Sequence, residues 1–146
     1  MLRAIHQQHG DGCFIGVVAT LLQIPYDKAF SRIHPGREMP PMDDYGTLGM
    51  TPEKSLEIMA SLGLELQPAN MKYVRSLRKG RTALILLRWR CMPTLLHGIV
   101  FDGETGNFLD PAEKPYASTR RDMQENLDSI YYVNHKPPAN RRMKNV

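Results

Sequence analysis

The sequence has few cysteines and lacks any long apolar run, and each shortage excludes a class of protein. Two cysteines among 146 residues are too few for a small secreted scaffold held together by disulfides. No apolar stretch approaches the roughly 20 residues that a membrane-spanning helix needs. The first residues carry no apolar signal core, so we expect no export by that route. These absences favour a cytoplasmic protein whose thiols stay free.

Acidic residues are missing from the C-terminal end. Residues 134–146 carry four basic side chains and no acidic one, which accounts for the whole net charge of +4. The preceding 133 residues hold 15 basic and 15 acidic side chains. We therefore expect one domain over residues 1–133, followed by a flexible basic tail over 134–146. A neutral body argues against nucleic acid as a partner, since only the tail is basic.

Helical periodicity dominates the first half of the chain. Residues 13–23 are apolar or small on nearly every side, so we expect a buried helix there, and residues 26–33 predict a second short one. Thr51-Pro52-Glu53 has the composition of a helix start, and Gly63 is a natural stop. Residues 34–50, which lie between the second and third predicted helices, are rich in proline and glycine. This composition predicts a loop long enough to bind a partner or to cover a site.

Strand patterns dominate the second half. Short apolar or alternating segments separated by turns predict five strands, at residues 64–66, 83–89, 98–101, 107–109 and 129–133. Residues 71–78 predict a helical turn with Val74 and Leu77 directed inward. Helices first and an antiparallel sheet afterwards indicate an α+β fold.

Four residues along the chain have the chemistry of a nucleophilic site. Cys13 stands where a polar, glycine-rich loop meets the first predicted helix, and the free N–H groups and dipole of a helix start favour the thiolate. Gln7, or its neighbour Gln8, can offer a side-chain N–H to an oxyanion. His97 heads a predicted strand as a candidate base, and Asp110 closes the next strand as the group that orients it.

In this order and spacing the chain resembles papain-like cysteine peptidases, most closely the branch that includes the double-glycine leader peptidases of bacteriocin exporters. The matching features are Gln7 six residues before Cys13, His97 followed by Gly-Ile-Val-Phe, and the pair Asp110-Pro111. The resemblance covers about residues 5–133. It implies a papain-like fold, in which an N-terminal helix carrying the cysteine packs on a small C-terminal antiparallel sheet.

The resemblance also implies an activity. A papain-like cysteine peptidase or amidase would cleave a peptide, isopeptide or related amide bond in a peptide or protein substrate, without a cofactor. Cys13 would form the acyl-enzyme, His97 would act as base, Asp110 would orient it, and Gln7 would stabilise the oxyanion. The same residues suit two other functions: a binding module, such as an inhibitor or effector whose site no longer turns over, and a thiol acyltransferase with an amine as acceptor.

A metal site is the remaining alternative for these side chains. His9, Cys13, Cys91 and His97 form a possible Cys2His2 set, but their spacings fit no tight zinc knuckle, so we expect no metal.

The other polar and aromatic candidates have more ordinary interpretations. We expect His9 and Asp11 to be surface or turn residues, Cys91 to be a thiol at a strand end, and Trp89 to anchor the sheet.

Overall fold

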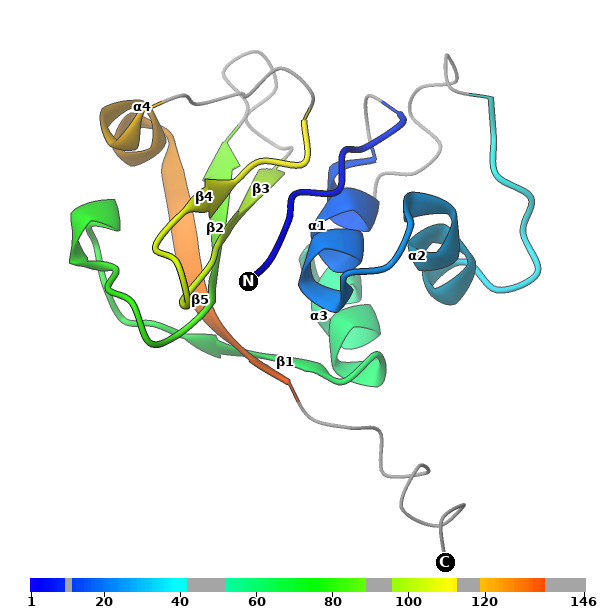
Figure 1. Ribbon diagram of the computed structural model, residues 1–146, viewed down its shortest axis with the longest axis horizontal. Helices are drawn as coiled ribbons and strands as arrows, with labels where there is room; N and C mark the ends of the chain where they lie inside the picture. The colour runs from blue at the N-terminus through cyan, green and yellow to red at the C-terminus, as the bar shows by residue number, and fades with distance from the viewer. Residues whose placement is uncertain (10–11, 42–51, 89–95, 113–118, 136–146) are drawn as a thin grey trace, which may run out of the picture.

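The first half of the chain folds into three helices that pack on one face of a sheet. The computed structural model describes residues 1–9, 12–41, 52–88, 96–112 and 119–135 (Figure 1). The helices are α1 (Cys13–Leu22), α2 (Tyr26–Ile33) and α3 (Pro52–Ser61). As its apolar sequence predicts, α1 is buried on nearly all sides, and Gln23 ends it in the left-handed conformation with a φ of 53°. Most of the predicted loop 34–50 and the predicted N-cap residue Thr51 fall outside the described residues.

The second half forms an antiparallel sheet whose strands follow the order β1-β5-β2-β3-β4. The strands are β1 (Leu64–Pro68), β2 (Ala83–Arg88), β3 (Leu96–Phe101), β4 (Phe108–Leu109) and β5 (Leu127–His135). The predicted α+β class is confirmed. Three strands are longer than their patterns indicated: β1 continues to Pro68, β3 begins before His97, and β5 continues to His135 by pairing with Leu64. Residues 134 and 135 are therefore part of the sheet, although the sequence placed them in the tail.

Apolar side chains pack against both faces of the sheet. Those of α1, α2 and α3 contact one face through Leu64, Leu84, Val100 and Val133. The opposite face is covered by the 3-10 turn η1 (Val74–Ser76) and by α4 (Arg120–Glu125). Val74 and Leu77 are buried there, as predicted. The sequence analysis missed α4, which begins where the Thr119 hydroxyl accepts a hydrogen bond from the Asp122 N–H.

The N-terminal segment runs between the helices and the sheet (Figure 1). Four of its backbone N–H groups donate to distant residues: Leu2 to Asp102 at 3.0 Å, Arg3 to Gln23 at 3.1 Å, Ile5 to Thr20 at 3.0 Å and Gln7 to Pro111 at 2.7 Å. The segment thus joins α1 to the part of the sheet that carries the end of β4.

Asp102 holds this segment to the turn after β3. Its buried carboxylate accepts hydrogen bonds from the N–H groups of Leu2 and Glu104 and from the Thr105 hydroxyl. Burial by itself raises the pKa of Asp102, but these hydrogen bonds outweigh that effect and lower the pKa below its ordinary value.

The helices that the structure describes are short compared with a membrane span. Within the described ranges, no single helix is long and apolar enough to cross a membrane. Only α1 and α2 taken as a pair, bent by 108°, meet the criteria of length and composition.

Candidate active site

Cys13 is the first residue of α1 and is almost completely buried, with 9% of its surface exposed. The glycine before it allows close packing: a Cβ on Gly12 would lie 2.0 Å from the Tyr26 hydroxyl oxygen, so no side chain fits there. Because the first N–H groups of a helix lack intrahelical partners, Cys13 sits where negative charge is stabilised. The sequence prediction that Cys13 opens a buried helix is confirmed.

The sulfur of Cys13 contacts the backbone of β3. The Gly98 N–H donates a hydrogen bond to Sγ with an N···S distance of 2.9 Å, and Sγ lies 3.8 Å from the Gly98 carbonyl oxygen. β4 pairs with β3 at Val100 and Phe101, so Gly98 contacts Cys13 outside that pairing. A Cβ on Gly98 would approach Val17 of α1 to 2.8 Å, so a glycine is what lets the helix come this close to the strand.

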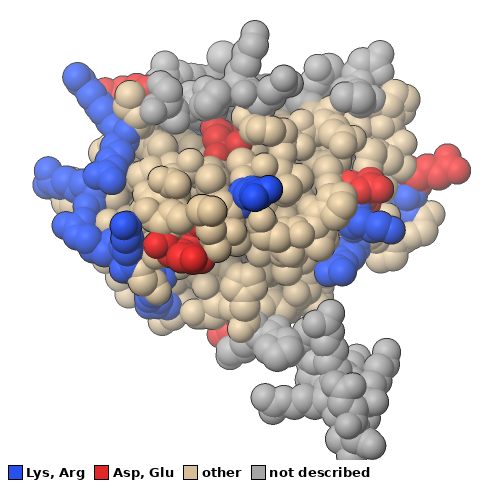
Figure 2. All heavy atoms as spheres, viewed as in Figure 1, with Lys and Arg blue, Asp and Glu red and all other residues tan. Residues whose placement is uncertain are grey.

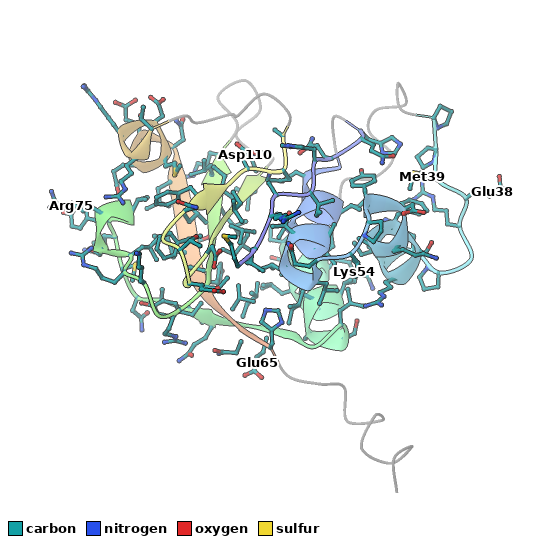
Figure 3. All side chains as sticks on the ribbon, in the orientation of Figure 1. Glu38, Met39, Lys54, Glu65, Arg75 and Asp110 are labelled. Carbon is teal, nitrogen blue, oxygen red and sulfur yellow. The ribbon has the colours of Figure 1, made fainter. Side chains whose placement is uncertain are left out.

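His97 is the residue of β3 next to Gly98, and its side chain is fully buried. Its Nε2 lies 2.7 Å from Oδ1 of Asp110, the residue that follows β4 (Figure 3). The same carboxylate oxygen also accepts the Ala112 N–H at 2.9 Å. Since Asp110 is fixed from the backbone side, it can hold the His97 ring in one orientation.

The pKa of His97 is raised by Cys13 as well as by Asp110. Burial lowers this pKa, but four effects outweigh burial: the charge of Cys13, the hydrogen bonds with Asp110 and with Cys13, and the charge of Asp110. Together they raise the pKa of His97 from 6.5 to about 10. At neutral pH His97 is therefore an imidazolium beside Asp110.

Gln7 lies beside the first turn of α1 and next to the residue that follows Asp110. Its N–H donates to the Pro111 carbonyl, and its side-chain Nε2 donates to the His9 carbonyl at 2.9 Å. A Cβ on Gly16 would lie 3.5 Å from the Gln7 Cβ. Gln7 is partly buried, whereas the neighbouring Gln8 is exposed. The structure thus brings Gln7, and not Gln8, close to the start of the helix.

His9 is buried, with 2% of its surface exposed, so the expectation of a surface residue is wrong. The expectation of a turn-forming residue is confirmed, because the His9 carbonyl accepts the Gly12 N–H three residues later. Its Nδ1 lies 3.0 Å from the Tyr26 hydroxyl, its Nε2 lies 2.8 Å from the Pro40 carbonyl oxygen, and its ring stacks on that of Tyr26. Its own carbonyl accepts hydrogen bonds from Gly12 and Gln7. His9 therefore holds Gln7, on its N-terminal side, and Gly12, the residue before Cys13. Its position in a polar loop gave no signal of this, because Tyr26 and Pro40 are distant in sequence.

The remaining sequence candidates concern a metal site and three residues that the structure does not describe. Among the described residues, no three His, Cys, Asp or Glu side chains are grouped so that they could hold a metal ion. Asp11, Cys91 and Trp89 lie outside the described residues, so the expectations for them, including the Cys2His2 set, are not tested.

Comparison with known proteins identifies no family. A scan of the sequence against models of protein families found no match, and a search of curated proteins found none either. The site must therefore be interpreted from its own geometry.

Proposed function

We propose that the protein is a papain-like, cysteine-dependent hydrolase that cleaves a peptide, isopeptide or related amide bond. The observation that carries the proposal is that the three candidates meet at β3: the His97 Nε2 lies 2.7 Å from Asp110 Oδ1, and the Cys13 sulfur accepts the N–H of Gly98, the residue next to His97. In the proposal Cys13 is the nucleophile, His97 is the base and Asp110 orients the base, which are the groups that covalent acyl transfer requires.

The proposed reaction begins with attack of the Cys13 thiolate on the substrate carbonyl carbon. The Cys13 backbone N–H and the Gln7 side chain would donate hydrogen bonds to the oxyanion that forms. The Nε2 atom of His97 is hydrogen-bonded to Asp110. In the proposal Nδ1 is therefore the atom that gives its proton to the leaving amine as the C–N bond breaks. Water then attacks the thioester and loses a proton to His97. The C–S bond breaks, which releases the carboxylic acid and restores the Cys13 thiolate beside protonated His97.

Two contacts support the chemistry without taking part in bond breaking. The Gly98 N–H stabilises negative charge on the sulfur before attack. His9 acts as a positioning residue, because its carbonyl holds the Gln7 side chain and the Gly12 N–H at the same time. We expect Tyr26→Phe, which removes one partner of the His9 ring, to slow acylation of Cys13 and leave its pH profile unchanged.

The pH dependence of Cys13 alkylation by iodoacetamide tests the proposed ion pair. A Cys91→Ser variant isolates the Cys13 thiol, and a Cys13→Ser variant measures the background from Cys91. The proposed ion pair requires a rate that is nearly flat between about pH 6 and pH 8. The profile, not the absolute rate, is the readout, since burial slows the reagent at every pH. A rate that rises about tenfold per pH unit, as for an ordinary thiol, would contradict the proposal.

Acylation by a small activated ester tests turnover directly. With p-nitrophenyl acetate, intact-protein mass spectrometry should detect an acetyl group on Cys13 that is lost with time. Cys13→Ala should abolish the adduct, and His97→Ala should be nearly as damaging because base and nucleophile act as a unit. Gln7→Ala should lower the rate of acylation by roughly 10²- to 10³-fold, whereas Asp110→Asn should retain some activity.

A binding module on the same scaffold is the second candidate. The observation that favours it is the burial of the site, since His97 is fully buried and Cys13 only 9% exposed. A flat alkylation profile without any acyl-enzyme would favour this second function, because the ion pair would then exist without access for a substrate.

A further inference from the structure

Five basic side chains gather on the face of the sheet opposite α1. Between residues 72 and 81 the chain has no acidic residue and five exposed basic ones: Lys72, Arg75, Arg78, Lys79 and Arg81. We call this segment the basic surface. Figure 2 shows Lys and Arg atoms concentrated over η1 and α4, and Figure 3 places Arg75 at the outer edge there. None of the five forms an ion pair with an acidic residue that the structure describes.

The neutral balance of the folded part conceals a separation of charge. Residues 1–133 have 15 basic and 15 acidic side chains, but outside residues 72–81 the same stretch has 10 basic and 15 acidic ones. The zero net charge of residues 1–133, which argued against nucleic acid, is therefore the sum of a positive surface and a negative remainder. Local potential, and not net charge, determines where a polyanion binds.

The backbone of the basic surface is held in place by the fold. The Gln124 side chain of α4 accepts the Val74 N–H at 2.8 Å and donates to the Lys72 carbonyl at 2.9 Å. At the other end, the Gly80 N–H donates to the Gly103 carbonyl at 2.7 Å. Val74 is 1% exposed and anchors the middle of the segment. The basic side chains thus project from a fixed backbone, which lowers the entropy lost when a ligand binds.

Aromatic rings lie among these charges. Tyr73 is 49% exposed, and the guanidinium carbon of Arg75 lies 4.8 Å from the centroid of its ring. Arg81 lies 3.7 Å from the centroid of Tyr132. Tyrosine rings and guanidinium planes are surfaces on which unpaired bases stack, while lysines neutralise phosphates. An acidic peptide would use only the charges.

We propose that the basic surface binds single-stranded nucleic acid. The interaction combines phosphate contacts from Lys72 and Lys79 with base stacking on the arginine–tyrosine pairs. This inference does not rest on the proposed hydrolase activity, because none of its residues contacts Cys13, His97 or Asp110 in the hydrogen bonds described above.

Fluorescence anisotropy with the full chain and a labelled oligothymidylate of about 12 nucleotides tests the charges. Lys72→Glu combined with Lys79→Glu should weaken binding at least about tenfold. It should also flatten the plot of log K against log salt by about 0.7 for each lost phosphate contact. The matched control is Lys28→Glu with Arg32→Glu, the same change of charge on exposed residues of α2. Equal loss in the control would overturn the proposal, because binding would then depend on net charge or on the tail alone.

The stacking contribution is tested at Tyr73. Tyr73→Ala should weaken binding about tenfold without changing the salt slope, and Tyr73→Phe should restore it. Circular dichroism of each variant controls for folding, and the Cys13 alkylation rate should not change. If Tyr73→Ala binds as wild type and a polyglutamate peptide competes as well as the oligonucleotide, the surface recognises acidic chains and the proposal is wrong.

Discussion

At the scale of single residues, two consecutive positions of β3 act on one sulfur atom. Gly98 donates its N–H to Cys13, and the ring of His97 interacts with the same side chain. Because side chains alternate across a strand, a slip of one residue in β3 would remove both contacts at once. The electrostatics of Cys13 therefore depend on the register in which β3 pairs with β2, where His97 lies opposite Leu87.

We predict that Cys13→Ala lowers the pKa of His97 well below about 10. The charge of Cys13 is the largest of the effects that raise this pKa, and its loss leaves burial to act in the opposite direction. The measurement is an NMR titration of the imidazole signals, assigned with a His97→Gln variant. Cys91→Ala is the matched control and should leave the His97 titration in place. An unchanged His97 pKa in Cys13→Ala would show that the thiol and the ring are not coupled.

The raised pKa of His97 also predicts how stability changes with pH. Below pH 6.5 the residue is protonated in the folded and the unfolded chain, and its stabilising contribution is fully present. Between 6.5 and about 10 only the folded state keeps the proton, so the contribution falls as pH rises and is lost above about 10. Urea unfolding of wild type and His97→Gln should therefore differ most near pH 6 and least near pH 10.5. A stability difference between wild type and His97→Gln that grows with pH would contradict this prediction.

The sequence was sufficient to predict the residues whose chemistry is local, but not those whose role comes from tertiary contacts. A cysteine at a helix start and a His and an Asp at strand ends carry signals that their neighbours supply. The importance of Gly98 depends on Cys13, which is 85 positions away, and that of His9 on Tyr26 and Pro40. No local pattern of polarity or spacing encodes such pairs.

At the scale of elements, the close contact between α1 and β3 places the sulfur at the strand. A glycine in β3 and the β-branched Val17 on α1 form this contact, since a Cβ at position 98 would lie 2.8 Å from Val17 Cγ2. Any larger residue at 98 must push the helix, and with it Cys13, away from the strand.

We predict that Gly98→Ala destabilises the protein by about 1–3 kcal/mol through this overlap. Val17→Ala creates the missing space, so the double variant should lose less stability than the sum of the two single ones. Urea denaturation of the four proteins gives the coupling energy. Strict additivity would mean that the Cβ is accommodated elsewhere. Alkylation of Cys13 in Gly98→Ala measures whether the helix has moved.

The elements that the sequence predicted best are those with a clear apolar period. The fully apolar run of α1 and the strand at 83–88 are long enough to identify their type. The period does not fix where a strand begins, so His97 was placed ahead of β3 and not inside it. The short helix α4 was missed because six residues, with only Met123 buried, leave almost no apolar period to detect. Thr119, a residue type that is favoured at helix N-caps, was the signal in the sequence that indicated this helix.

At the scale of the whole molecule, the last strand lies inside the sheet. β5 pairs with β1 on one side and with β2 on the other, so it joins the segment after α3 to the three strands that carry the candidate site. The N-terminal segment adds a second connection through Leu2 and Gln7. Both ends of the described chain therefore hold the helical half to the sheet.

We predict opposite outcomes for two C-terminal deletions. Removing residues 136–146 should leave the melting temperature nearly unchanged, because the described sheet ends at His135. Removing residues 127–146 takes away β5 and separates β1 from β2, so cooperative unfolding should disappear. Differential scanning calorimetry distinguishes the two. A loss of many degrees on the shorter deletion would show that residues beyond the sheet pack on the domain.

The strand order also has a consequence for the protein while it is being made. A ribosome releases Cys13 early, but Gly98, His97 and Asp110 follow only after most of the chain, and β5, which completes the sheet, comes later still. During synthesis the thiol is therefore present without the base that would activate it. A nascent chain that stops before β3 would carry Cys13 without His97 and Asp110, so the proposed reactivity would begin only after the strands up to β5 have been made.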